Sequence, residues 1–232
     1  MMSKEKIFCF PYAGGSSTLY EGSFQGLAKA FDVVSVDYSG HGTKFGLPLN
    51  ETMDALVDEV YGEVVGRLSR GESYCLFGYS LGSIVAYEIA CRLRDAGYRA
   101  PRVLFLASMS APRRIPEEEW IHQLPEDEFL KALVEDGGID EELASDPLMA
   151  EVFLPIIRMD FRIHELYEGK RHDILGTDAV ILYSREDISD EDIHTWDGLF
   201  THVAYHCYPG GHFFIYDRAD EVVAEILKRR KD

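Results

Sequence analysis

Apolar residues along this chain form short runs bounded by glycine, proline and other turn-forming residues. Runs of this length and composition are typical of buried β-strands. They predict strands at residues 6–10, 32–37, 74–78, 102–108, 178–184 and 203–208, and the first of these has the character of an edge strand.

The segments between these runs show helical periodicity. In residues 54–68, apolar side chains recur on one face of a helix and acidic side chains lie mostly on the other. A second helix is predicted at 81–96, because Gly97 stands where glycine commonly ends a helix. Strands that alternate with helices favour a mostly parallel central sheet with helices on both faces.

The region between the fourth and fifth predicted strands is too long for a single crossover connection. It is predicted mainly as helix, with aromatic and aliphatic residues at mixed helical spacing. Long insertions in compact domains are usually functional. We therefore expect one domain over residues 1–232, with a helical cap inserted at about 110–177 above the carboxyl-terminal edge of the sheet.

A serine flanked by glycines stands at the junction of the third strand and the second helix. Residues 78–82 are Gly-Tyr-Ser-Leu-Gly and match the G-x-S-x-G nucleophile elbow in its strand–turn–helix context. The sharp turn exposes the serine hydroxyl and requires small residues two positions to either side. This motif predicts Ser80 as a nucleophile on an α/β-hydrolase fold.

A serine hydroxyl needs a base to activate it, and the chain has eight histidines. His212 directly follows the last predicted strand, where the chain order of serine, acid and histidine in this fold places the base. His41, in a Gly-His-Gly turn before the serine, is better suited to shaping that turn. His202 and His206, with Cys207, could instead ligate a metal, but no further carboxylate or cysteine pattern completes such a site.

The acid that orients the base is expected just after the fifth strand. Asp187 is the leading candidate there, and Glu186, Asp190 and Asp192 are close alternatives. Its carboxylate would accept a hydrogen bond from one ring nitrogen of His212 and stabilise the imidazolium.

Acyl transfer passes through a tetrahedral oxyanion, which backbone N–H groups usually stabilise in this fold. Leu81, directly after the serine, offers one such group. The loop after the first strand, Pro-Tyr-Ala-Gly-Gly at residues 11–15, could bring the N–H of Ala13 to the serine as the second donor. A plain glycine turn is the alternative interpretation of this loop.

Composition narrows the range of partners. The net charge of −18 predicts repulsion of nucleic acid and of anionic membrane surfaces. No apolar run approaches the roughly 18 residues of a membrane span, and no signal-peptide pattern precedes the first strand, so we expect a cytoplasmic protein. The four cysteines are scattered, and we expect them to be reduced and mostly buried.

The motifs resemble those of the type II thioesterases that accompany nonribosomal peptide and polyketide synthases. The resemblance covers nearly the whole chain and includes Phe-Pro-Tyr-Ala-Gly-Gly at 10–15, Gly-His-Gly at 40–42, the elbow, and Gly-Gly-His-Phe-Phe at 210–214. In the cap, Leu-Pro-Ile-Ile-Arg-Met-Asp-Phe at 154–161 is similar to a segment that few other hydrolases share.

This resemblance implies an editing hydrolase that removes aberrant acyl groups from the phosphopantetheine arm of carrier proteins. Carrier-protein domains would be its partners, and no metal or cofactor of its own is expected. The resemblance implies Ser80, Asp187 and His212 as the catalytic triad, with Ala13 and Leu81 as oxyanion donors. We expect a monomer.

Three positions depart from the family pattern. Tyr79 stands where histidine is usual, Ser39 where proline is frequent, and Ser184 where glycine is common. These changes leave the chemistry intact but weaken inference about substrate preference. Because carrier proteins are generally acidic, docking would depend on local basic or apolar patches, and Arg113 and Arg114 are candidates.

Two other classes of function remain open from the sequence. A small-molecule carboxylesterase, or a release enzyme or cyclase excised from the end of a synthase, would use the same serine, and G-x-S-x-G does not separate them. A binding protein that keeps the fold without catalysis is the second class. The sequence supplies a candidate for every triad role, which argues against it.

Overall fold

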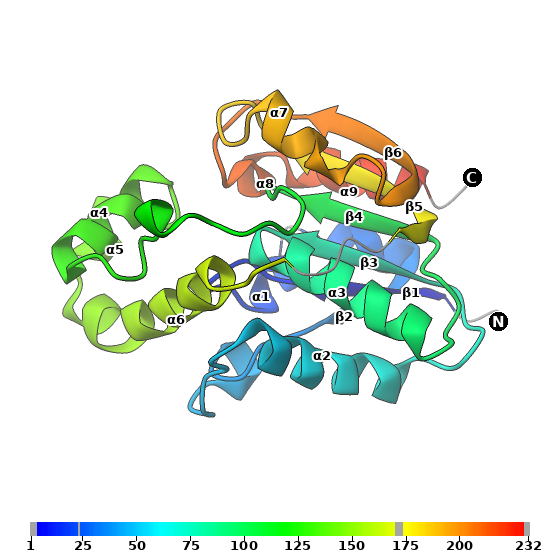
Figure 1. The fold of residues 1–232 in the computed structure, drawn as a ribbon, viewed down its shortest axis with the longest axis horizontal. Coiled ribbons are helices and arrows are strands. Elements are labelled where there is room, and N and C mark those ends of the chain that lie inside the picture. Colours follow the sequence, from blue (N-terminus) through cyan, green and yellow to red (C-terminus); the bar gives the residue numbers. More distant parts are fainter. Residues whose placement is uncertain (1–3, 23, 170–173, 230–232) are drawn as a thin grey trace.

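A six-stranded sheet forms the centre of the fold (Figure 1). The computed structural model describes residues 4–22, 24–169 and 174–229. The strand order is β2-β1-β3-β4-β5-β6, and all neighbouring strands pair in parallel. The strands are β1 (Glu5–Phe10), β2 (Phe31–Ser35), β3 (Tyr74–Tyr79), β4 (Val103–Ala107), β5 (Leu175–Tyr183) and β6 (Phe200–Cys207).

All six predicted strands are present, with two corrections. The edge position expected for β1 is wrong, because β2 pairs along its outer side and becomes the edge strand. β5 and β6 begin at Leu175 and Phe200, ahead of the predicted starts at 178 and 203. Each strand opens with one buried apolar residue, Leu175 or Phe200, but exposed or polar residues follow it, so the first residues form no continuous apolar run. The pairing of β5 also shifts register between Leu175 and Asp178.

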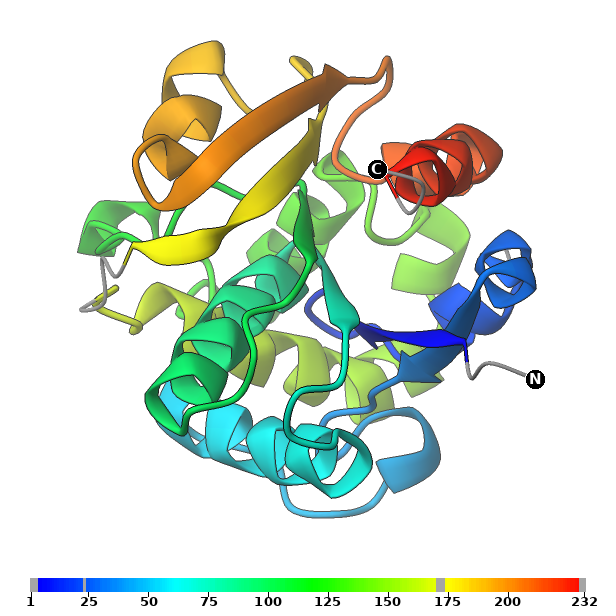
Figure 2. The same ribbon diagram turned by 90° about the vertical axis from the view of Figure 1, so that its right-hand side faces the viewer.

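Helices cover both faces of the sheet (Figure 2). One face carries α2 (Met53–Arg67) and α3 (Leu81–Asp95), which pack against alternate β1 side chains such as Phe8 and Phe10. The other face packs on the intervening residues of β1. The helices of this second face are α1 (Thr18–Gly22), η1 (Gln25–Lys29), α8 (Phe214–Asp217) and α9 (Ala219–Lys228). The short segments α7 (Asp190–Ile193) and η5 (His194–Trp196) pack instead on the face of α2 and α3, through Ile193 and Trp196. A further short segment, η2 (Gly42–Lys44), follows β2.

Between β4 and β5 the chain leaves the sheet and forms helices beyond the carboxyl ends of the strands (Figure 1). We call described residues 110–169 the cap. It has its own small apolar cluster, built around Phe129, Leu133 and Leu154. The guanidinium of Arg158 lies 4.2 Å from the ring centre of Phe129. The elements of the cap are η3 (Glu117–Glu119), α4 (Glu126–Glu135), α5 (Glu141–Ala144), the π-helical turn η4 (Met149–Phe153) and α6 (Leu154–Glu165).

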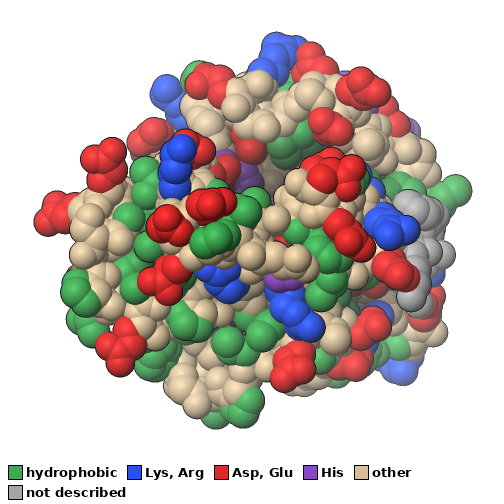
Figure 3. All heavy atoms as spheres, turned by 60° about the vertical axis from the view of Figure 1, so that its left-hand side comes forward, with side chains coloured by type: hydrophobic (Ala, Val, Ile, Leu, Met, Phe, Trp, Pro, Cys, Tyr) green, Lys and Arg blue, Asp and Glu red, His purple; other side chains and the backbone are tan. Residues whose placement is uncertain are grey.

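The surface is predominantly acidic, as the net charge of −18 leads one to expect. Seen from the side of the cap, acidic side chains are spread over the face of the molecule (Figure 3). Within the described part of the chain, no helix combines the length and the apolar character that crossing a bilayer requires.

Candidate active site

Ser80 lies at the tight turn between β3 and α3, in a strained backbone conformation with φ 52° and ψ −122°. The two flanking glycines make this turn possible. A Cβ atom on Gly78 would lie 2.1 Å from the carbonyl oxygen of Gly82, and one on Gly82 would lie 2.1 Å from that of Phe10. Both collisions involve backbone, which cannot rotate away, so the elbow requires glycine at both positions.

His212, in the loop after β6, faces the serine. Its Nε2 lies 3.1 Å from Oγ of Ser80, and its Nδ1 lies 2.9 Å from Oδ1 of Asp187. Because an ionised carboxylate only accepts hydrogen bonds, Nδ1 carries the proton of the neutral imidazole. Nε2 is then free to accept the proton of the serine hydroxyl, which is the arrangement that nucleophilic acyl transfer needs.

Of the four acids considered after β5, the structure places Asp187 against the imidazole. Its side chain is buried, and the turn that carries it is closed by a hydrogen bond from its N–H to the carbonyl of Ser184. Glu186 instead accepts from the N–H of Gly210. Asp190 binds Tyr183 and Arg185, and Asp192 accepts from the hydroxyl of Ser189. Spacing along the chain alone did not separate these residues.

The loop that carries His212 is held by side chains that sequence reasoning did not assign. The carbonyl of His212 accepts hydrogen bonds from the hydroxyls of Tyr79 and Ser108, the latter at 3.1 Å. Ser184 donates to the carbonyl of Gly210 in the same loop. Tyr79 and Ser184 are two of the departures from the family pattern, and both hold the loop that carries His212. The sequence did contain one sign of this support, because each of three adjacent strands, β3, β4 and β5, ends at or just before a residue with a hydroxyl group.

The charge of His212 is tuned by two carboxylates. Burial disfavours the imidazolium, but the hydrogen bond and charge of Asp187, aided by Asp136 in the cap, raise the pKa of His212 above its usual value. Burial and the nearby Asp187 also raise the pKa of Asp136, while His212 opposes this.

The same three residues offer ligand atoms that all lie within 4.8 Å of one another. Nδ1 of His212 is hydrogen-bonded to Asp187, and Asp136 acts on the imidazole through its charge. His202 and His206, considered above for a metal, have separate partners in Asp178 and Glu225.

The two residues expected to donate to the oxyanion come from separate segments near the serine. Leu81 is the first residue of α3, where the N–H groups have no acceptor within the helix. Ala13 follows β1 and lines the same cavity as Ser80. The next residue, Gly14, has a φ of +75° and donates its N–H to Asp160 of the cap helix α6 at 2.7 Å.

Two hollows meet at His212. The first, of about 300 Å³, contains Ser80 and extends beneath the cap, where its walls are mainly apolar residues such as Leu133, Met149 and Ile157. The second, of about 270 Å³, lies beside Asp187 and includes Arg113 and His164. Burial, with the charges of Arg113 and His212, lowers the pKa of His164 to about 4, so this imidazole is neutral at pH 7.

Comparison with known proteins identifies the family of this chain. The family model described as thioesterase domain matches residues 5–229. The gramicidin S biosynthesis protein GrsT of Aneurinibacillus migulanus is 26% identical, over 98% of this chain and 89% of GrsT.

Two solved structures share the whole fold. ClbQ, from the colibactin NRPS/PKS pathway, is 27% identical with a TM-score of 0.91, covering 99% of this chain and 98% of ClbQ. The type II thioesterase BorB, from the borrelidin biosynthetic cluster, is 25% identical with a TM-score of 0.87, covering 99% of this chain and 94% of BorB. The chain therefore belongs to the thioesterase domain family, has its α/β-hydrolase fold, and is similar to its type II members.

Proposed function

We propose that this protein is a serine thioesterase that hydrolyses acyl groups from the phosphopantetheine arm of carrier proteins and so clears stalled nonribosomal peptide or polyketide synthases. The observation that carries the proposal is the chain of contacts from Asp187 through His212 to Ser80, at the edge of an apolar cavity beneath the cap. Family membership supports the thioester as the bond that is cleaved.

In the first half of the proposed reaction, Nε2 of His212 takes the proton of Ser80 as Oγ attacks the thioester carbon. The oxyanion is stabilised by the N–H groups of Ala13 and Leu81, and Asp187 stabilises the imidazolium. The carbon–sulfur bond then breaks, and the leaving thiolate takes the proton from His212. An acyl ester remains on Ser80.

In the second half, His212 removes a proton from water, and the resulting hydroxide attacks the acyl ester. The tetrahedral intermediate uses the same two N–H donors. Its collapse releases the carboxylic acid and returns the proton from His212 to Ser80, so the enzyme is regenerated without a cofactor. A thiolate leaves more readily than an amine, and the first half needs little acid assistance for that reason.

The two hollows suit the two ends of such a substrate. The apolar cavity beside Ser80 can take an acyl chain, whose burial is favourable because it leaves water. The second hollow, which also borders His212, has mixed polar and apolar walls and includes Arg113, whose charge suits a phosphorylated arm. Arg113 is partly exposed and forms an ion pair with Glu119, so the carboxylate of Glu119 partly neutralises its charge at the second hollow.

The relatives support the carrier-bound substrate. GrsT is named for gramicidin S biosynthesis, and ClbQ comes from an NRPS/PKS pathway. Both match this chain over nearly its full length. Acyl groups in such pathways are carried on phosphopantetheine arms, which supports a carrier-protein domain as the partner.

The test measures release of acyl groups from an acyl carrier protein, from acyl-pantetheine and from a simple ester. We expect the highest kcat/KM with the carrier, and a loss of at least about 10⁴-fold in kcat for Ser80→Ala. Equal kcat/KM for all three substrates would identify a small-molecule esterase instead. Undiminished release by Ser80→Ala would refute the serine mechanism.

A further inference from the structure

The cap helix α6 rests directly on the loop that carries Ala13. Asp160 of α6 accepts the N–H of Gly14 through Oδ2 at 2.7 Å. One turn earlier on the helix, Ile157 approaches so closely that a Cβ atom on Gly14 would lie 2.5 Å from its Cγ1. Gly14 also has a φ of +75°, which favours glycine. The backbone next to the proposed oxyanion donor is thus seated against the cap by a hydrogen bond and by packing.

The same carboxylate oxygen binds His41 from the turn after β2. Nε2 of His41 lies 2.8 Å from Oδ2 of Asp160, and the two side chains are 3% and 4% exposed. Nδ1 of His41 lies 3.2 Å from the carbonyl oxygen of Ser39, which only accepts hydrogen bonds. An imidazolium facing an ionised Asp160 satisfies both ring nitrogens. Burial disfavours the positive charge, but the hydrogen bond and charge of Asp160 raise the pKa of His41 above its usual value.

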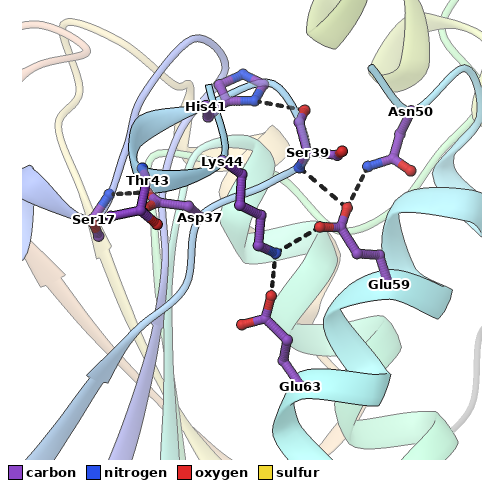
Figure 4. Close-up of polar contacts among 9 residues, drawn as sticks. All are labelled: Ser17, Asp37, Ser39, His41, Thr43, Lys44, Asn50, Glu59 and Glu63. Carbon is purple, nitrogen blue, oxygen red and sulfur yellow. Dashed lines mark hydrogen bonds and ion pairs between the residues drawn. The ribbon is translucent and has the colours of Figure 1, made fainter. Parts of the chain in front are cut away.

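The turn that carries His41 is itself firmly anchored (Figure 4). Asp37 accepts the N–H and hydroxyl of Ser17 at 2.6 and 3.0 Å, and those of Thr43 at 2.9 and 2.7 Å. Burial opposes ionisation of Asp37, but these bonds lower its pKa below the usual value. Gly42 packs so closely that a Cβ atom there would lie 2.4 Å from Oδ1 of Asp37. His41 is therefore presented from a rigid support.

From these contacts we infer that His41 and Asp160 are positioning residues for the oxyanion loop: through Asp160 they hold the amide of Gly14, and with it the N–H of Ala13, while the cap is seated. The inference rests on the proposed reaction at Ser80. His41 touches no reacting atom in it and acts only through Asp160. The pair makes the oxyanion hole depend on the position of α6, so the hole is complete when the cap rests on Gly14.

Kinetics with an acyl-pantetheine substrate test this role. Asp160→Ala removes the acceptor for Gly14, and we expect kcat to fall about 10- to 100-fold with little change in KM, because a misplaced donor weakens transition-state stabilisation. The affinity for a trifluoromethyl ketone, whose adduct on Ser80 places an oxyanion in the hole, should fall by a similar factor. Asp160→Asn keeps one oxygen that can stand in the place of Oδ2 and accept the N–H groups of both Gly14 and Nε2 of His41, so it should recover part of the lost kcat.

Glu165 provides a matched control on the same helix. It is buried, accepts the N–H groups of Ile121 and His122, and forms an ion pair with the His122 side chain, all within the cap. Glu165→Ala should lower the free energy of unfolding about as much as Asp160→Ala does, yet leave kcat near the wild-type value. Equal losses of kcat in the two variants would overturn the inference.

A second variant keeps the inference testable should Asp160→Ala not fold. Replacing a buried ion pair by apolar residues of similar size often preserves stability. We therefore expect the double variant His41→Leu/Asp160→Leu to unfold near the wild-type midpoint and still lose kcat about 10- to 100-fold. Wild-type kcat in this variant, alongside an inactive Ser80→Ala, would refute the positioning role and leave the proposed function standing. An active Ser80→Ala would refute the proposed function itself.

Discussion

At the scale of single residues, hydrogen-bond chemistry decides which groups can act together. The carboxylate of Asp187 only accepts hydrogen bonds, so it fixes the tautomer of His212 and leaves the other ring nitrogen facing Ser80. The sequence supplied several acids for this task within a few residues of one another. Only the fold shows which of them reaches the imidazole, because the contact joins residues 25 positions apart.

The first prediction concerns Asp187. Asp187→Asn keeps the shape of the side chain but offers an N–H to Nδ1, which drives the imidazole proton to Nε2 and leaves no acceptor for the Ser80 hydroxyl. We expect kcat to fall about 10⁴-fold with an unchanged unfolding midpoint. Asp190→Asn, on the same loop but bonded to Tyr183 and Arg185, is the control and should retain activity. Comparable losses in both variants would contradict the assignment.

The second prediction concerns pH. In the proposed reaction His212 acts as a base when neutral, so kcat/KM should rise as pH increases through its pKa. Because this pKa is raised, the rising limb of the pH profile should lie above the usual value of 6.5. The charge of Asp136 contributes to that rise. Asp136→Asn should move the limb to lower pH without lowering the plateau. Glu135→Gln, whose carboxylate pairs with Lys131, should leave the limb in place. If the rising limb of the pH profile does not move in Asp136→Asn, the carboxylate of Asp136 does not raise the pKa of His212.

At the scale of elements, the elbow shows how closely β1, β3 and α3 approach. The first turn of α3 runs directly against the end of β1, and the space for a side chain at Gly82 is filled by backbone of Phe10 and Pro11. The local sequence predicted this turn, because its glycines lie within two residues of the serine. It did not predict that β1 lies inside the sheet, since strand order depends on which strand pairs beyond it.

Matched glycine substitutions test this packing. Gly82→Ala would place its Cβ 2.1 Å from a backbone oxygen, and we expect a loss of at least about 3 kcal/mol in the free energy of unfolding, or no folded protein. Gly62, in α2, has no atom within 4 Å of its hypothetical Cβ. Gly62→Ala should therefore gain about 0.5–1 kcal/mol, because alanine favours the helix. Urea unfolding measures both, and equal stabilities would contradict the close approach.

At the scale of the whole molecule, charge shapes encounters with a partner. The net charge of −18 sets up a field that repels an acidic carrier protein at long range. Docking of the proposed carrier protein would then depend on short-range contacts, and Arg113 at the second hollow would be a local exception to the repulsion. Salt screens long-range repulsion much more than it weakens close apolar contacts.

This predicts an unusual salt dependence. As ionic strength rises from about 0.01 to 0.15 M, the Debye length falls from about 30 to 8 Å, and kcat/KM for an acyl carrier protein should increase. Acyl-pantetheine, which is uncharged, serves as the control and should show little change. A fall in kcat/KM for the carrier over the same range would indicate that attraction at a basic patch dominates docking.

The sequence by itself determined the features encoded by contiguous residues. The short apolar runs, the glycine-flanked Ser80, the position of His212 after the last strand and the resemblance to thioesterases were all readable along the chain. Each depends on local conformational preference or on chain order.

Tertiary structure decided what depends on distant residues meeting. The contact of Asp160 with His41, 119 positions away, could not be inferred from either segment, nor could the support of His212 by Tyr79 from 133 positions away. The place of β1 in the sheet and the apolar cavity beneath the cap belong to the same class. The physical reason is that hydrogen bonds and packing act over a few ångströms. The number of residues between two positions does not say how far apart they lie in the folded protein.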